Sequence, residues 1–370
     1  MESLKKNGKW IYALLLVVLI LPLFWWWRNG LLYTGKILLI QITALVGSYF
    51  MFRELYQNHL AVLLGVTLYV TSPWRFDMCY VQNRLLLSGV WSLVPLYLFF
   101  LVRLKRTESR RKKWLQSVLP AVVILAAIGY GSHVMFCLMA GFTLLAMLVL
   151  RRTEALWVLA GGVILWFPGN VNFLRYLFAQ SPIDLGVPIQ NIVPNGYVVL
   201  DYFTSFVYQA GRPGLGLGLL LLLGVISYRY MVYGNVNMTR ESKAFGVAGG
   251  LCLFAATRYF PWELVQRLGE WALKFISLME TPALFAGFAV LFLPVAAVAT
   301  VDESEWEKKR IAAAVVDGSE RKAQEMRAAM SVKEVSEGEK ERLAAIGSLA
   351  ICWIAAIGIA VYQCYVLVGA

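Results

Sequence analysis

The sequence predicts an all-α membrane protein, a polytopic bundle of about 11 transmembrane helices. Hydrophobic residues make up 59% of the 370 residues and charged residues 15%, whereas soluble domains hold about 45–50% and about 25%. The apolar residues also gather in long runs of the kind that cross a bilayer as helices. This composition excludes a soluble globular protein, a disordered chain and a disulfide scaffold.

The apolar runs define the predicted spans in order along the chain. A span needs about 20 apolar residues, and several of the runs are shorter or contain Gly and Pro. The expected spans are residues 10–27, 31–52, 58–73, 86–103, 115–131, 133–150, 154–168, 214–232, 244–258, 281–300 and 345–368. The first follows a basic start and lacks a small-x-small cleavage site, so we expect a retained signal anchor.

Three regions follow from this pattern. Residues 1–300 form the transmembrane bundle, and residues 345–370 hold the last helix. Between them, residues 301–344 carry 11 acids and 9 bases, which predicts a charged cytoplasmic insert that is helical or partly disordered. Residues 169–213 and 258–280 contain amphipathic, aromatic stretches, which predict short helices on the outer surface.

The basic residues predict the orientation of the chain. With the N-terminus inside, 25 of the 34 Lys and Arg residues face the cytoplasm, as the positive-inside rule requires. We therefore expect a cytoplasmic N-terminus and an external C-terminus. The net charge of +12 then reflects orientation and contact with anionic membrane lipids, and no nucleic-acid partner is expected.

The segment "TSPWRFDMCYVQNR" gathers polar groups at the predicted outer end of the third span. Arg75, Tyr80 and Arg84 are suited to hold a lipid phosphate through charge-assisted hydrogen bonds. Asp77 has the chemistry of a general base. The alternative is that these residues only anchor the chain at the headgroup level.

Two other residues complete the candidate site. His133, in "GYGSHV", lies at a span end, where an imidazole can exchange a proton with a substrate. Its alternative is a helix-start residue whose hydrogen bonds are satisfied. Arg258, on a predicted outer segment, is a further candidate for binding the lipid phosphate. The sequence contains no CxxC, HExxH or P-loop motif, so neither a metal nor a cofactor is expected.

An ordered series of segments resembles one family of bacterial polytopic membrane proteins. The segments are "VTSPWRFDMCYVQNRLLLSGVWSLVPLYLF", "GYGSHV", "PGLGLGLLLLLGV", "ATRYFPWELVQ" and "LKFISLMETPALFAGFAVLFL". In this order they resemble the YfhO-like proteins, also described as related to 6-pyruvoyl-tetrahydropterin synthase. Those proteins look like members of the GT-C glycosyltransferase superfamily.

The resemblance implies a GT-C-like bundle in the plasma membrane of a bacterial cell envelope and a reaction at the outer face. The implied reaction is glycosyl transfer from a polyprenyl-phosphate sugar, which is the donor substrate. A carboxylate would deprotonate the acceptor hydroxyl, and Arg and His would stabilise the departing phosphate.

The sequence also departs from the family pattern. The first outer loop is only residues 28–30 and lacks the acidic residues of the family. The arginine that the family carries is missing from "METPALF". Apolar Leu86 and Leu87 stand where the family often has an acidic residue. Three readings therefore stay open. The chain is a transferase with full, reduced or lost activity, a non-catalytic assembly or binding subunit whose partner docks at 301–344, or a lipid or solute transporter.

Overall fold

The computed structural model describes most of the predicted bundle. The described residues are 31–56, 58–106, 114–150, 153–178, 196–204, 213–233, 239–269, 272, 274 and 282–299. The predicted spans at 10–27 and 345–368 and the insert at 301–344 lie outside them, as do parts of 169–213 and 258–280. Within the described residues the chain is mostly helical and forms no strand, which confirms the all-α class.

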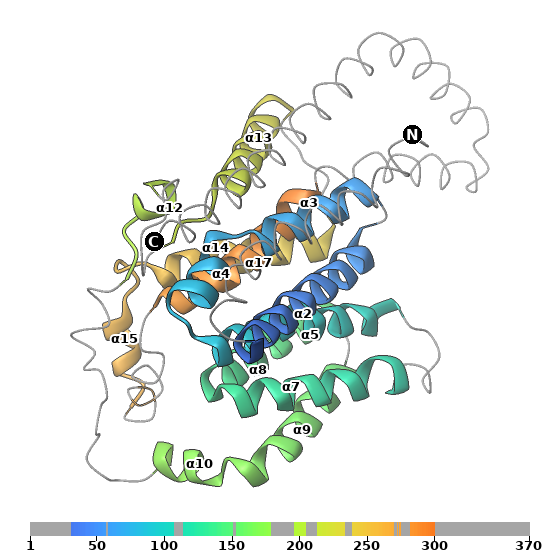
Figure 1. Cartoon of the computed structure of the whole chain (residues 1–370), viewed down its shortest axis with the longest axis vertical. Coiled ribbons are helices and arrows are strands. Elements are labelled where there is room, and N and C mark those ends of the chain that lie inside the picture. The colour runs from blue at the N-terminus through green and yellow to red at the C-terminus, as the bar shows by residue number, and fades with distance from the viewer. Residues whose placement is uncertain are drawn as a thin grey trace.

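The described helices follow one another along the chain with short connections (Figure 1). The longer helices are α2 (Leu31–Leu55), α3 (His59–Val70), α5 (Leu85–Arg106), α7 (Leu119–Gly131), α8 (His133–Leu150), α9 (Glu154–Trp166), α10 (Val171–Phe178), α13 (Leu217–Tyr233), α14 (Arg240–Ala256) and α17 (Ala283–Ala299). The shorter elements are α4 (Pro73–Phe76), η2 (Asp77–Val81), η3 (Trp114–Val118), η4 (Phe167–Gly169), α12 (Asp201–Thr204) and α15 (Trp262–Gln266).

Several of these helices have the length and composition of membrane spans. Gly35–Leu55, Leu85–Leu104 and Trp114–Gly131 are long and apolar enough to cross a bilayer. Shorter apolar helical stretches cover His133–Leu148, Glu154–Gly169, Leu217–Ser227 and Leu284–Ala299. The described residues therefore show an all-α chain suited to a membrane, and the total of about 11 spans stays a prediction.

Helices α2 and α5 run side by side in the same direction. A Cβ atom on Gly47 would lie 3.1 Å from the backbone of Leu96, and one on Gly89 would lie 3.9 Å from Ile40. The rings of Phe50 and Phe99 are 5.5 Å apart further along the same pair. Small residues let helix backbones approach closely where no water drives association, so Gly47 sets the spacing of the pair, whereas a Cβ on Gly89 would make only an ordinary contact.

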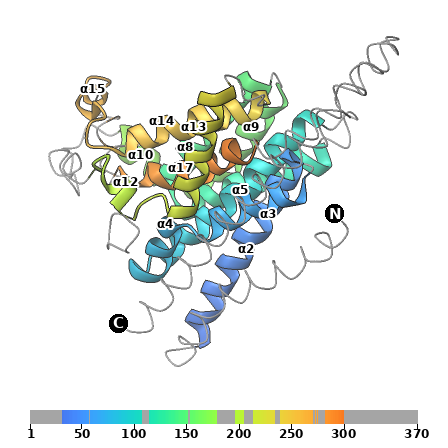
Figure 2. The same ribbon diagram turned by 90° about the horizontal axis from the view of Figure 1, so that it is seen from above.

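A second layer is built from α3, α14 and α17, with α17 in contact with both of the others. Figure 2 shows α13, α14 and α17 on one side of α2 and α5. Tyr56 joins the layers, because its hydroxyl donates to the carbonyl of Val295 and lies 3.0 Å from the hydroxyl of Ser242. Gly249 packs against Leu293, which brings α14 close to α17.

Helices α7, α8 and α9 complete the described bundle on the other side of α5. Gly161 and Gly162 of α9 lie against Val122 and Leu125 of α7. At the end of the pair, the indole nitrogen of Trp166 donates to the carbonyl of Gly129 over 3.2 Å. The residue numbers of the contacting partners increase together along the two helices, so α7 and α9 run parallel.

Segments from distant parts of the sequence meet at the end of the bundle where α4 lies. Tyr197 forms a parallel bridge with Thr257, just after α14, and its hydroxyl donates to the carbonyl of Pro213 over 2.9 Å. Gly216 then approaches Pro73 at the start of α4, where a Cβ would lie 2.9 Å from the proline ring. Its φ of +88° is a second reason why this position favours glycine. We call this region the α4 end of the bundle.

Candidate functional site

The local sequence breaks the helix before the candidate site and re-forms it with a different pitch. Pro73 stands at the first position of α4, where proline is well tolerated. Directly after α4, η2 is a turn of π-helix, and the amide of Gln82 donates to the carbonyl of Asp77 over 2.9 Å. Single π turns inside α-helical segments are frequent at functional sites. Asn83, with φ of +53°, ends the turn in a conformation that Asn tolerates better than most residues.

Arg75 is buried at this point, with only 5% of its surface exposed. Its Nη2 donates to Oε1 of Gln41 over 3.2 Å. Its guanidinium carbon also lies 4.8 Å from the centre of the Tyr69 ring, in a cation–π contact. The Tyr69 hydroxyl donates to the carbonyl of Trp91 over 3.0 Å, which fixes the ring under the guanidinium.

The second terminal nitrogen of Arg75 is unsatisfied. Among the described residues, Nη1 is buried and has no hydrogen-bond partner. A buried donor without a partner is costly, more so when it is charged. The two side chains that hold the guanidinium, Gln41 and Tyr69, are neutral, so the arrangement is suited to receive an anion.

Tyr80 belongs to the same group of side chains. Nε2 of Gln41 donates to its hydroxyl over 3.4 Å, and its ring packs 4.9 Å from that of Phe76. Gln41 therefore links the two residues: its side-chain oxygen accepts from Arg75, and its side-chain nitrogen donates to Tyr80. We refer to Gln41, Tyr69, Arg75 and Tyr80 as the Arg75 cluster.

Asp77 lies next to this cluster in sequence and is fully buried. Its Oδ2 accepts a hydrogen bond from Nε2 of Gln82 over 2.5 Å. The π turn makes this contact, because it places residues five apart on the same side of the helix. The side-chain amide of Gln82 thus orients this carboxylate.

Cys79 lies on the same turn and is also buried. Burial raises the pKa of its thiol to about 11, and the nearby Arg75 guanidinium offsets only part of that rise. The thiol is therefore protonated at neutral pH. Since the thiolate is the reactive form of cysteine, Cys79 is not suited to act as a nucleophile.

Arg84 and Arg258 are exposed, unlike Arg75. Arg84 follows the π turn, where its amide donates to the carbonyl of Met78 over 3.0 Å. Arg258 pairs its backbone with Tyr197 at the α4 end of the bundle. Its Nη2 donates to the hydroxyl of Tyr259 over 3.3 Å. The Arg258 guanidinium thus bonds to its own neighbour in the chain, outside the Arg75 cluster.

His133 occupies a separate, aromatic environment at the start of α8. Its ring stacks on Phe173 of α10 with centroids 4.2 Å apart and meets Trp166 edge-on at 6.0 Å. Within the part of the chain that the structure describes, its buried Nδ1 has no hydrogen-bond partner. The structure thus brings Arg75 and Tyr80 together and places Asp77 beside them in the chain, and it shows His133 in a different set of contacts.

Sequence reasoning missed Gln41 and Tyr69, which hold Arg75 in place. The available signal was a single glutamine within an otherwise apolar run, "LLIQIT", because a buried amide in a membrane helix needs a polar partner. Among the described residues, no group of three or more His, Cys, Asp or Glu side chains is placed to hold a metal ion.

Comparison with models of known protein families, with curated proteins and with solved structures finds no match to this chain. The family resemblance of the ordered segments therefore stays a prediction. What the described residues establish is an all-α chain with apolar helices and a buried arginine cluster at the α4 end of the bundle.

Proposed function

We propose that this chain is an integral membrane protein that binds the phosphate of a polyprenyl-phosphate sugar at the Arg75 cluster and transfers the sugar to an acceptor hydroxyl. The observation that carries the proposal is the buried Nη1 of Arg75, which has no partner among the described residues. A guanidinium is the preferred side chain for phosphate because its planar donors match the phosphate oxygens.

The other contacts of the cluster support binding of an anion. Gln41 occupies Nη2 and leaves Nη1 as the donor for a phosphate oxygen. The Tyr80 hydroxyl, already linked to Gln41, is a second donor within the same group. Because only 5% of Arg75 is exposed, binding requires the surrounding side chains to rearrange and admit the ligand.

Transfer assigns complementary roles to Arg75 and Asp77. The bond between the anomeric carbon and the phosphate oxygen breaks, and its electron pair stays on the phosphate. Arg75 stabilises the charge that develops there. The acceptor oxygen forms the new bond to the anomeric carbon, and its proton passes to the Asp77 carboxylate, which Gln82 orients.

Exposed cations at the same end of the bundle support recruitment of the donor. Arg84 follows the π turn, and Arg258 stands where the α14 end meets Tyr197. Exposed charges act on association more than on the bound state, because solvent and salt screen them. Both residues therefore attract the anionic lipid toward the cluster.

A transfer assay in proteoliposomes tests the proposal. The purified chain is supplied with a radiolabelled polyprenyl-phosphate sugar and a membrane acceptor, and Asp77→Asn should lower turnover by about a hundredfold or more. Asp201→Asn is the matched control, because this carboxylate accepts a hydrogen bond from the amide of Val198 and does not belong to the Arg75 cluster. Equal turnover in the wild type and Asp77→Asn would remove the assigned base.

His133 is tested separately in the same assay. His133→Phe keeps a flat ring against Phe173 and Trp166 but removes both nitrogens. Lower turnover at unchanged stability would show that the imidazole takes part in the reaction. Unchanged turnover would assign His133 to packing between α8 and α10.

A second function, a non-catalytic binding or assembly subunit, is favoured by the full burial of Asp77. A carboxylate held by Gln82 and shielded from solvent suits a structural role as well as a catalytic one. Binding of the polyprenyl phosphate without turnover of any donor would favour this function. Net flux of lipid or solute across the proteoliposome would instead favour a transporter.

A further inference from the structure

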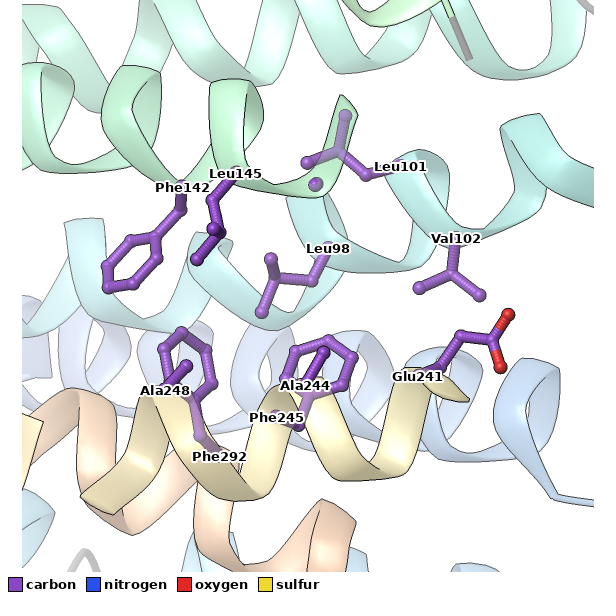
Figure 3. Close-up of a pocket in the computed structure, with 11 residues that line it drawn as sticks. Leu98, Leu101, Val102, Phe142, Leu145, Glu241, Ala244, Phe245, Ala248 and Phe292 are labelled. Carbon is purple, nitrogen blue, oxygen red and sulfur yellow. The ribbon is translucent and has the colours of Figure 1, made fainter. Parts of the chain in front are cut away.

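A groove of apolar side chains opens between α8 and α14, away from the α4 end of the bundle (Figure 3). Its floor is formed by Leu98 of α5 and Phe292 of α17, and its sides by Leu145 of α8 and by Ala244 and Ala248 of α14. The cavity volume is about 70 Å³. Leu145 is 45% exposed, so the groove opens onto the outside of the bundle, which lipid would surround in a membrane.

The small side chains of α14 create the groove. Ala244 and Ala248 lie one turn apart on the same helix face, and α8 and α14 make only limited contact there. An apolar cavity of about 150 Å³ takes up a whole benzene ring. A volume half as large suits a segment of one linear hydrocarbon chain.

One end of the groove is charged. Glu241, in the first turn of α14, is the acidic residue among the described residues that line the groove. Figure 3 shows its carboxylate next to Val102. Arg240 precedes it in the same turn and is exposed. A carboxylate next to a cation is complementary to a headgroup that carries an ammonium next to a phosphate.

We propose that one acyl chain of a phosphatidylethanolamine molecule of the surrounding membrane occupies this groove, with its ammonium on Glu241 and its phosphate beside Arg240. The apolar lining accounts for the chain and the charge pattern for the headgroup. This lipid site lies at the start of α14, whereas the Arg75 cluster lies near the opposite end of that helix. Failure of one proposal would therefore leave the other unaffected.

Lipid retention by the full chain tests this site. The protein is reconstituted in nanodiscs that contain equal parts of phosphatidylethanolamine and phosphatidylglycerol, released into detergent and analysed by native mass spectrometry. We expect one retained phosphatidylethanolamine per chain. Glu241→Gln should lower the preference for phosphatidylethanolamine over phosphatidylglycerol about tenfold, because a hydrogen bond between charged groups is lost.

A pair of bulky substitutions on α14 separates the groove from the rest of the surface. Ala244→Phe fills the groove and should abolish retention of lipid. Val247→Phe, on the same helix and 64% exposed, should leave retention unchanged. If Ala244→Phe fails to fold, judged by thermal unfolding, Leu145→Trp narrows the groove from α8 instead.

Three results would overturn the proposal. The first is a wild-type chain that retains no lipid, and the second is retention that survives every groove-filling variant that folds. The third is a preference for phosphatidylglycerol, because Arg240 and not Glu241 would then select the headgroup.

Discussion

Arg75 combines a buried charge with neutral surroundings. Gln41 accepts one of its hydrogen bonds and the Tyr69 ring faces its guanidinium, while Nη1 has no partner among the described residues. Burying a cation in this way costs free energy that a neutral side chain of similar size does not. A residue held at such a cost is better explained by ligand binding than by stability.

Replacing Arg75 with an apolar residue should therefore leave the fold intact. In Arg75→Met we expect the free energy of unfolding to change by less than about 1 kcal/mol, because relief of the buried charge offsets the hydrogen bond lost at Gln41. Equilibrium denaturation in detergent micelles measures this change. A loss of more than about 3 kcal/mol would show that Arg75 is a structural residue.

The sequence could identify Arg75 and Tyr80 but not the contacts that connect them. Both residues stand in one short polar segment, so their spacing in the chain already suggested a shared site. Gln41 and Tyr69 come from other helices, and their distance from Arg75 depends on how α2 and α3 pack. The sequence also could not give the contacts of His133, because this residue meets Phe173 only when α10 folds back on α8.

At the scale of elements, α4 is held in place by a stack of aromatic rings. Trp74 meets Trp91 edge-on with centroids 4.7 Å apart, and Trp91 lies 4.4 Å from Phe288 of α17. Gly287 gives Trp74 the space for its ring, since a Cβ there would come within 2.6 Å of the indole. The position of Arg75 therefore depends on a glycine more than 200 residues away in the chain.

Adding one methyl group at Gly287 should destabilise the fold. We expect Gly287→Ala to lower the free energy of unfolding by about 1–3 kcal/mol, because the packed indole of Trp74 must shift. The matched control is Gly250→Ala on α14, where a Cβ meets nothing within 4 Å. The control should be neutral or stabilising by up to about 1 kcal/mol, since alanine favours the helix.

Both variants are compared by the same denaturation measurement. Equal stabilities for Gly287→Ala and Gly250→Ala would contradict the close packing of Trp74. A selective loss in Gly287→Ala that is accompanied by weaker phosphate binding would show that the aromatic stack positions Arg75.

The helices themselves were well predicted by the sequence. The predicted run 133–150 coincides with α8 (His133–Leu150), and 31–52 falls within α2 (Leu31–Leu55). Apolar length and Gly or Pro boundaries carry this information locally. The π turn at Asp77–Val81 was not predicted, because a single turn of changed pitch leaves no mark on the hydrophobic pattern.

For the whole molecule, the ends of the described helices form two groups. Arg84 and Arg258 stand at the α4 end of the bundle, with the start of α5 and the end of α14. Arg53 stands at the end of α2 and Lys243 at the start of α14, which are the opposite ends of these helices. The distribution of Lys and Arg along the whole sequence predicts a cytoplasmic N-terminus, which would let α2 begin at the outer face. We therefore propose that the α4 end, where α2 begins, faces outward.

Labelling of introduced cysteines in intact cells tests this orientation. A maleimide that does not cross the membrane should label Arg84→Cys and Arg258→Cys directly. It should label Arg53→Cys and Lys243→Cys only after permeabilisation. All four positions are exposed in the structure, and the unmodified chain gives the background from native cysteines. The reverse pattern would place the Arg75 cluster at the cytoplasmic face.

Equilibrium binding of polyprenyl phosphate to the purified chain tests whether the Arg75 cluster binds a lipid phosphate. We predict saturable binding that Arg75→Met weakens by about tenfold or more, because a charge-assisted hydrogen bond is lost. Arg84→Met, which removes an exposed charge, should weaken it by less than about threefold in physiological salt. No binding to the wild type, or equal affinity in the wild type and Arg75→Met, would contradict the claim.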